Sequence, residues 1–344
     1  MVVIKSSHIP GLATVLALGV SSVASAAPLD QTNQDQLTAS DAAQAQSSIF
    51  VTNVISDRFS PVSNALSLPG APGNGQPQAQ GIAGGDPDLL KGWSLWGSTS
   101  ARHSENSFAP EQQKSNSWSL TAGADRPISD TTTLGVSVTL SRDNADTAFG
   151  TGTRDTNAIH VSTYANFKLN DWLAADVSLG YGYTDTKQMR TVFGAPVTGS
   201  YKGHSVFGAA NLKASKWQGP WLISGVVGLS GSSTRRDGFV ESNGTVNAAG
   251  RSDLLQARIG GTIGYYSAPM LPYLSAEYIY DLDFDRSLAP GATNDRDEFR
   301  VTLGTHIYGT GDNQNLSGGI AISHSFGRDN KDDTSVNLSL RIAF

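Results

Sequence analysis

The most regular feature of the chain is a strict alternation of apolar and polar residues, repeated in long segments up to the C-terminus. In the last segment, 334–344, an apolar residue stands at every second position from Val336 to Phe344. A period of two is the pattern of a β-strand with one apolar and one polar face. We find twelve such segments and predict a strand for each: 92–103, 115–125, 131–142, 157–168, 172–184, 201–214, 220–230, 253–266, 271–281, 298–308, 315–326 and 334–344.

The connections between these strands alternate in length. Short turns follow the even-numbered strands, at 126–130, 170–171, 215–219, 267–270 and 309–314. Longer loops follow the odd-numbered strands, at 104–114, 143–155, 185–200, 231–252 and 282–297. An even number of long strands, sorted in this way, is typical of an outer-membrane barrel with both ends in the periplasm. The predicted fold class is therefore all-β, a 12-stranded antiparallel transmembrane β-barrel of the outer membrane.

Aromatic residues gather near the strand ends and predict two girdles at the membrane interfaces. Those beside the short turns are Trp172, Trp217, Trp221, Tyr265, Tyr266 and Phe344. Those beside the long loops are Tyr181, Tyr183, Tyr278 and Tyr280.

Composition narrows the class of protein further. Hydrophobic residues make up 38% of the chain and the mean hydropathy is −0.22, which argues against a bundle of membrane helices. A barrel fits these values because every second residue faces a polar lumen. The net charge of −6 argues against a nucleic-acid partner. The chain contains no cysteine, so disulfides play no part in its fold.

The region before the strands predicts three parts. Residues 1–26 have the pattern of a secretory signal peptide, with Lys5, an apolar core at 12–20 and small residues before the cleavage site. Segment 27–67 contains a predicted helix at about 39–60, capped by Thr38 and ended by Pro61. At 1.5 Å per residue it is about 33 Å long, which suits the inside of a pore, although a linker helix in solution is the alternative. A Pro/Gly-rich linker, 68–90, leads to the barrel domain at 91–344.

Charged residues on the polar strand faces are expected to face the lumen, because a charge facing lipid at mid-depth costs about 2–4 kcal/mol. They are Asp176, Arg258, Glu277, Arg300 and Arg341. The helix end contributes Asp57 and Arg58 to the predicted contacts between helix and lumen. Asp176 is the predicted partner of Arg58, and Arg341 is the predicted partner of Asp57. The frequent glycines on the lumen face predict room for a helix about 10–12 Å across.

A leader, a polar helix, a linker and a twelve-stranded barrel ending on Phe344 resemble the translocator domain of autotransporters (type V secretion). The run 92–97 (Gly-Trp-Ser-Leu-Trp-Gly) and the run 134–138 (Leu-Gly-Val-Ser-Val) are similar to segments that open strands in that family. Asn337, Ile342 and Phe344 resemble its C-terminal assembly signal, with Ser339 where glycine is usual. The resemblance implies a passenger carried N-terminally through the pore, yet only about ten residues lie between the predicted cleavage site and the predicted helix.

We therefore predict an outer-membrane translocator or pore of a Gram-negative bacterium with almost no passenger of its own, and no enzyme. A surface adhesin acting through the extracellular loops is the alternative. A barrel-embedded hydrolase is a third reading, with His160 and Ser162 two positions apart on one strand.

Charges at the loop end of the barrel suggest two other sites. These charges are His103, Asp281, Asp283 and Asp285, which could serve proteolysis or bind Ca²⁺, with solvated rim charge as the favoured interpretation. No cofactor or metal is expected. The expected partners are outer-membrane lipid and lipopolysaccharide, the barrel-assembly machinery and periplasmic chaperones, and the protein is expected to be a monomer.

Overall fold

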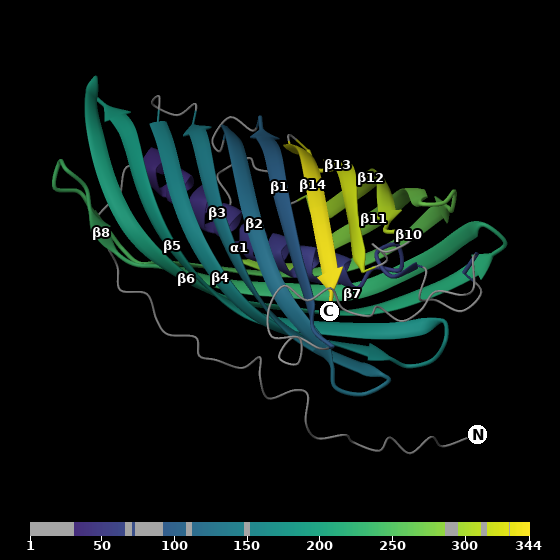
Figure 1. The fold of residues 1–344 in the computed structure, drawn as a ribbon. Coiled ribbons are helices and arrows are strands. Elements are labelled where there is room, and N and C mark those ends of the chain that lie inside the picture. Colours follow the sequence, from purple (N-terminus) through teal and green to yellow (C-terminus); the bar gives the residue numbers. More distant parts are fainter. Residues whose placement is uncertain are drawn as a thin grey trace, which may run out of the picture.

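The structure is a computed structural model that describes residues 31–65, 71–72, 92–107, 112–147, 152–285, 295–310, 315–329 and 331–344. Its dominant feature is a closed barrel of twelve antiparallel strands around one helix, α1 (Gln31–Arg58) (Figure 1). The barrel strands are β1 (Ser94–Asn106), β2 (Gln113–Pro127), β3 (Thr132–Thr147), β4 (Gly152–Lys168), β5 (Leu173–Val192), β6 (Ala195–Gln218), β7 (Trp221–Arg236), β10 (Gly250–Tyr265), β11 (Met270–Asp285), β12 (Asp297–Tyr308), β13 (Leu316–Phe326) and β14 (Lys331–Ala343). A separate hairpin between β7 and β10 consists of β8 (Phe239–Val240) and β9 (Val246–Asn247).

Each barrel strand pairs with the next one along the chain, and β1 closes the barrel against β14 from Ser94↔Ala343 to Asn106↔Lys331. The predicted number, order and approximate position of the strands are confirmed. Alternation also places the side chains as predicted, with Leu179 59% exposed on the outer face and Thr121 1% exposed inside. A closed antiparallel barrel pairs its backbone groups between strands and leaves no edge.

Several predictions about the wall are wrong, and the predicted loops 143–155 and 231–252 are both shortened because β3, β4, β7 and β10 extend into them. Residues 185–200 are not a loop, because β5 and β6 continue to a two-residue turn, Phe193-Gly194, in which both residues have positive φ. Above the apolar band both strand faces are polar, so hydrophobic alternation no longer reveals the strand. Figure 1 shows this hairpin as the tallest part of the wall. Trp217 and Tyr266 do not join an outer girdle, because they pack together in an aromatic contact at the base of the barrel interior.

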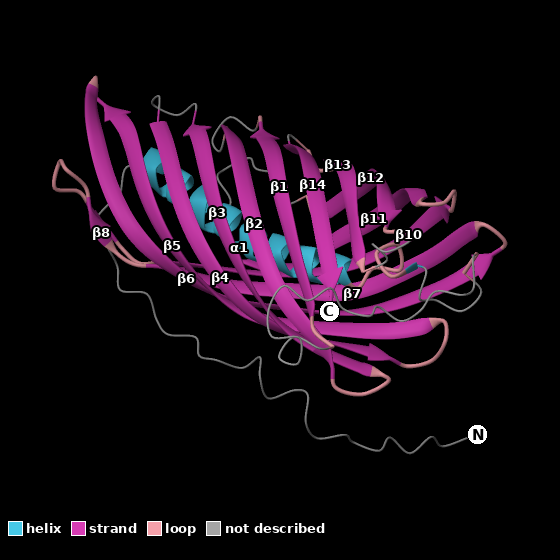
Figure 2. Cartoon of the chain, viewed as in Figure 1, coloured by secondary structure: helices cyan, strands magenta, loops and turns pink. Residues whose placement is uncertain are grey.

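Helix α1 lies inside the barrel along its length (Figure 2). It begins at Gln31, eight residues before the predicted start at residue 39, and ends at Arg58. The early turns escaped prediction because a helix in a polar lumen needs no apolar stripe, and Thr38 is consequently a helix-interior residue and not a cap. The described part of the chain contains no helix that is long and apolar enough to span a membrane. The predicted signal peptide, and the predicted linker apart from residues 71–72, lie outside the described residues.

Aromatic rings on the inner face lie over glycines of the neighbouring strand. Trp96 is directly opposite Gly123, and Tyr164 is directly opposite Gly135. A Cβ added at Gly123 would lie 2.5 Å from Nε1 of Trp96, so only glycine fits beneath the ring. The same arrangement joins Phe207 to Gly180, His160 to Gly182 and Tyr273 to Gly304. Most of these lumen glycines therefore make room for barrel aromatics and not, as predicted, for the helix.

We expect the substitution Gly123→Ala to lower the free energy of unfolding by about 1–3 kcal/mol, the usual cost of overpacking. The Trp96 ring cannot easily move aside, because it is buried and its Nε1 donates a 2.7 Å hydrogen bond to Tyr164 Oη. Urea unfolding of the detergent-folded barrel, followed by circular dichroism, measures the loss. Gly97→Ala is the control, since a Cβ there meets nothing closer than 3.6 Å. Equal losses in both variants would contradict the ring-over-glycine explanation.

Candidate functional site

The lumen and its helix form the candidate site. Helix α1 makes its main contacts with β4, β5, β6, β7 and β10. A cavity of about 250 Å³ remains beside it, between the helix and the strands β1 and β10 to β14. The cavity wall includes the charged side chains of Asp57, Arg102, Glu277, Arg300 and Arg341. The helix thus occupies one side of the pore and leaves a polar, charged space along the other.

A buried ion pair holds the helix at the short-turn end. Arg58 donates from Nε to Asp125 Oδ2 at 3.0 Å and from Nη2 to Asp125 Oδ1 at 2.9 Å. Both side chains are less than a tenth exposed, and this two-point geometry is the strongest form of such a pair. Arg58 is also the last residue of the helix, where a positive charge is stabilised by the helix dipole.

The predicted partner of Arg58 is elsewhere. Asp176 lies on β5, where it forms a 2.8 Å ion pair with Lys213 and accepts a 2.9 Å hydrogen bond from Asn211 Nδ2. Lys213 also donates to the backbone oxygen of Ser56 at 2.6 Å. Asn211 likewise donates to Ser56 Oγ at 3.2 Å, so Asp176 contributes to helix binding indirectly, through Lys213 and Asn211.

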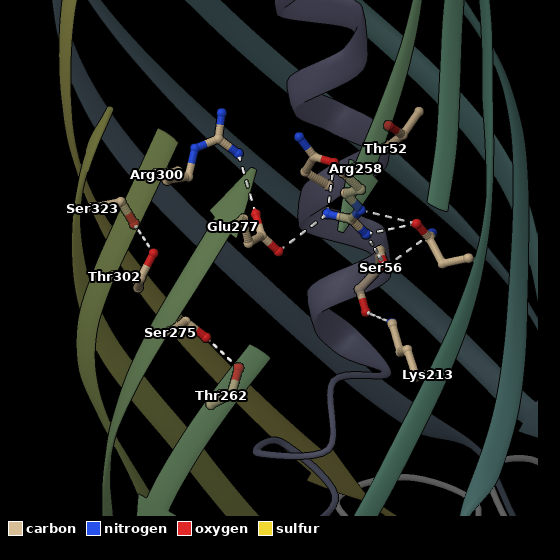
Figure 3. A network of polar contacts seen from close by, with 12 residues as sticks. Thr52, Ser56, Lys213, Arg258, Thr262, Ser275, Glu277, Arg300, Thr302 and Ser323 are labelled. Atoms are coloured by element: carbon tan, nitrogen blue, oxygen red, sulfur yellow. Dashed lines mark hydrogen bonds and ion pairs between the residues drawn. The ribbon is translucent and has the colours of Figure 1, made fainter. Parts of the chain in front are cut away.

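Arg258 is the main contact at the middle of the pore (Figure 3). Its guanidinium donates to Asn53 Oδ1 at 3.2 Å and to Ser56 Oγ at 3.0 Å. Glu277 lies between Arg258 and Arg300, at 3.9 and 3.8 Å respectively. Arg300 makes its shorter ion pair, 2.8 Å, with Glu298 on its own strand. Of this group, Arg258 reaches the helix directly, whereas Glu277 and Arg300 line the cavity beside it.

A second buried ion pair holds the helix toward the long-loop end. Asp41 of the helix accepts a 3.0 Å hydrogen bond from Nε of Arg236, and Nη1 of Arg236 donates to Ala248 O at 3.0 Å. Phe239 of the β8–β9 hairpin packs with Leu37 and Tyr201. The hairpin is fixed in turn by Glu241, which accepts from Arg190 at 2.7 Å. The loop between β7 and β10 thus folds back over the first turns of the helix.

The chain that follows the helix fills the short-turn end of the lumen. Val62, Ala65 and Ala71 pack against an inner cluster formed by Trp217, Leu222, Leu271 and Tyr308. Trp217 donates to Ala65 O at 3.0 Å, and the Tyr308 hydroxyl donates to Val62 O. This contact explains why Trp217 faces inward.

The predicted pair of Arg341 and Asp57 is not formed. Arg341 donates to Ser94 Oγ at 2.8 Å and to Asn64 Oδ1 at 3.2 Å. The Asp57 side chain is exposed to the cavity, with no ion pair in the described residues. The sequence prediction placed both residues in the right region, but one turn of helix decides which side of the lumen each side chain meets.

Sequence reasoning missed the residues that hold the helix most firmly, namely Asp41, Asp125, Lys213 and Arg236. Asp125 is the polar neighbour of Ala124 in an alternating strand, so alternation marks it as a lumen residue but names no partner for it. Arg236 lay in the predicted loop 231–252, and Asp41 lay in the first turn of the predicted helix with no predicted partner. Their pairing depends on the stagger between strands, which alternation does not reveal.

The described structure does not bring the candidate catalytic and metal-binding residues together into one site. His160 and Ser162 face the lumen and are 1% and 2% exposed, and no hydrogen bond joins them in the described structure. Asp281 is buried against Arg328 at 2.7 Å and Gln256 at 2.7 Å. Within the described ranges no group of three or more acidic, His or Cys residues could hold a metal. His103 faces outward and is hydrogen-bonded to Asn116 at 2.9 Å.

The residues of the predicted assembly signal lie on and just beyond the closing strand β14. Asn337 points into the lumen and donates to Ser98 Oγ at 2.9 Å. Ile342 is paired with Leu95 on one side and Leu316 on the other. The backbone of Phe344 bonds to Trp93 and Gly92, so the last residue still belongs to the closure between the two ends of the barrel.

Comparisons with known proteins agree on the barrel. The family model described as the autotransporter beta-domain matches residues 94–292, more than half of the chain. The translocator domain of the autotransporter NalP from Neisseria meningitidis is similar with a TM-score of 0.65 and 15% identity, covering 75% of this chain and 91% of that one. The β-domain of the Bordetella autotransporter BrkA is similar with a TM-score of 0.61 and 17% identity, covering 74% of this chain and 100% of that one. The transport unit of the autotransporter AIDA-I from Escherichia coli is similar with a TM-score of 0.53 and 17% identity, covering 82% of this chain and 96% of that one. No curated protein sequence matches the chain.

We expect Asp125→Asn to destabilise the folded protein by about 3–5 kcal/mol, because it leaves the buried charge of Arg58 without a counter-charge. Urea unfolding of the detergent-folded protein measures this loss. The exchanged variant Arg58→Asp/Asp125→Arg should recover part of it. Lys168→Gln, which breaks an exposed 3.0 Å pair with Asp171, serves as the control and should cost less than about 1 kcal/mol. A small loss in Asp125→Asn would show that the pair does not hold the helix.

Proposed function

This chain belongs to the autotransporter β-domain family, and we propose on that basis that it resides in the outer membrane of a Gram-negative bacterium. Its barrel is a translocator barrel of that family. The long loops then lie at the cell surface and the short turns in the periplasm, as the alternation of loop lengths requires. The expected partners are lipid and lipopolysaccharide around the barrel, and the assembly machinery and chaperones during insertion. We assign the barrel no catalytic step.

The observation that supports transport is the direction of the helix in the pore. Helix α1 begins at Gln31 near the long-loop end and ends at Arg58 beside Ser94, where β1 begins. Residues joined to the N-terminal side of Gln31 are therefore attached at the surface end of the pore. A chain with this path has its N-terminal part outside and its C-terminal barrel in the membrane, which is the arrangement expected after translocation.

The contacts of the helix fit a segment that was threaded through the lumen. The wall binds it through hydroxyl, amide and charged groups, for example Ser232 to Ala45 O at 3.0 Å and Ser205 to Ser48 at 3.1 Å. Each such hydrogen bond contributes only about 0.5–1.5 kcal/mol, because water replaces it when the segment moves. We infer that the two ion pairs at Asp41 and Arg58 stop the segment at its final depth.

An adhesive function is a second candidate, supported by apolar side chains on the surface hairpins. Phe193, at the tip of the β5–β6 hairpin, is fully exposed, and Val240 and Val246 of the β8–β9 hairpin are 61% and 67% exposed. Large apolar side chains at loop tips often serve binding. This function would use the same barrel as a platform.

An epitope inserted after Asp30 tests the translocator function. We expect antibody to label it on intact cells, because the insertion point adjoins the surface end of the helix. The same epitope in the turn between Asn170 and Asp171 is the control and should be labelled only after permeabilisation. Labelling of the first insert only after permeabilisation would refute translocation. Loss of cell adhesion in Phe193→Ser, with no surface labelling of the insert, would favour the adhesive function.

Removal of the pore contents should open the channel. We expect a variant that begins at Gly92 to conduct several times more current in planar bilayers than the protein that begins at Ala27. The reason is that α1 fills the lumen together with Val62, Ala65 and Ala71, which pack at its short-turn end. A heat-induced gel shift checks that both proteins contain a folded barrel. Equal conductance would mean that the helix does not occupy the pore in the membrane.

A further inference from the structure

One row of side chains crosses four adjacent strands on the outer surface of the barrel. The pairing registers place Tyr183 of β5 opposite His204 of β6, His204 opposite Arg235 of β7, and Arg235 opposite Arg251 of β10. Directly opposite residues have Cβ atoms about 4.5–5.5 Å apart. The row therefore places two guanidinium groups and an imidazole side by side, facing away from the lumen.

The Arg235–Arg251 pair is unfavourable unless a negative group joins it. Like charges directly opposite each other destabilise a sheet. Arg251 is hydrogen-bonded through Nε to Asp253 at 3.1 Å, whereas Arg235 is exposed and makes no ion pair in the described residues. On the other side of the barrel, outward-facing cations have acidic partners, as in Lys114 with Glu105 at 3.0 Å and Arg142 with Asp155.

The height of the row matches the headgroup layer of a membrane. Fourteen positions separate Arg235 from Trp221, which lies at the short-turn end of the same strand. At about 3.3 Å per residue and a tilt of about 40°, this spans about 35 Å along the barrel axis, beyond an apolar band about 25 Å tall. Ile223, Val227 and Leu229 face outward between them and are 46–49% exposed. The row thus lies about 10 Å beyond the apolar band, and on β7 the outward positions between Leu229 and Arg235 are Gly231 and Ser233.

Neighbouring groups bring further charges of both signs close to the row. The Tyr181 hydroxyl is hydrogen-bonded to His204 Nδ1 at 2.6 Å, which fixes the ring and leaves its Nε2 for another partner. Lys202, two positions above His204, adds a further exposed cation. Three carboxylates lie nearby: Asp185 opposite Lys202, Asp253 beside Arg251, and Asp237 after β7. These carboxylates equal the three cations Lys202, Arg235 and Arg251 in number, but none of them forms an ion pair with Arg235 in the described residues, so its guanidinium is available to a phosphate.

We propose that the row of His204, Arg235 and Arg251 is a binding site for the phosphate groups of lipopolysaccharide in the outer leaflet. This inference rests on the proposed membrane location, with the long loops at the cell surface. Arginine guanidinium groups bind phosphate through paired, charge-assisted hydrogen bonds. The acyl chains of the same lipid would lie on the apolar surface of β6, β7 and β10 directly below. One phosphate between Arg235 and Arg251 would remove their mutual repulsion.

The test compares variants of the purified full-length protein in one detergent. We expect Arg235→Gln/Arg251→Gln to raise the Kd for purified lipopolysaccharide at least about tenfold, since loss of one charge-assisted hydrogen bond is of that size. The matched control, Lys114→Gln/Arg142→Gln, removes two cations from the opposite side and should change the Kd less than about twofold. Arg235→Lys/Arg251→Lys keeps the charge and should retain part of the affinity. A heat-induced gel shift shows whether each variant contains a folded barrel.

The second arm changes the lipid. Lipopolysaccharide stripped of its phosphates should bind wild-type protein as weakly as the intact lipid binds the Gln double variant. Equal binding of both lipids, or no loss in the double variant, would overturn the proposal. The proposal would also be overturned if phosphatidylglycerol micelles or inorganic phosphate displaced bound lipopolysaccharide as well as unlabelled lipopolysaccharide does. The site would then recognise any phosphate. These measurements do not depend on transport, so failure of the epitope experiment would leave them interpretable.

Discussion

A polar helix enclosed by a barrel has little bulk water around it, and this constraint organises the whole interior. A charge on the helix that is buried against the wall needs a partner there, because a buried charge without one is very costly, whereas Asp57 faces the cavity. Asp41 meets Arg236 and Arg58 meets Asp125, at opposite ends of the helix and with opposite polarity. In one pair the helix carries the acid and in the other it carries the base. Together the two ion pairs fix the depth and the rotation of the helix, because sliding or turning the helix would break both ion pairs.

The barrel could be predicted from the sequence because a membrane makes its outer face uniform. Each strand must present an apolar face over a fixed height, so alternation reveals the strand, its faces and its neighbours. The alternation ends where the apolar band ends, which is why the upper parts of β5 and β6, residues 185–192 and 195–200, were predicted to be a loop. Helix α1 lacks such a signal altogether, because its surroundings are polar on most sides and no stripe of apolar residues marks its first turns.

The partners of individual charges could not be predicted, for a different reason. Alternation assigns a residue to a face but gives neither its height nor its angle around the barrel. Asp176 and Asp125 are both lumen aspartates, and only the stagger of the strands brings Asp125 to Arg58. The glycines illustrate the same limit. A glycine on the inner face suggests empty space, yet Gly135 lies beneath the ring of Tyr164 because the register sets them opposite each other.

The position of the helix on one side of the lumen has a mechanical consequence. Helix α1 makes most of its contacts with β5, β6, β7 and β10, whereas β11 to β14 border the cavity beside it. β12 and β13 are also the shortest of the barrel strands, with 12 and 11 residues, and so have the fewest hydrogen bonds per pairing. The wall is therefore stiff over one arc and compliant over the other. Bending and changes of cross-section concentrate in the compliant arc, which includes the closure where the first strand meets the last.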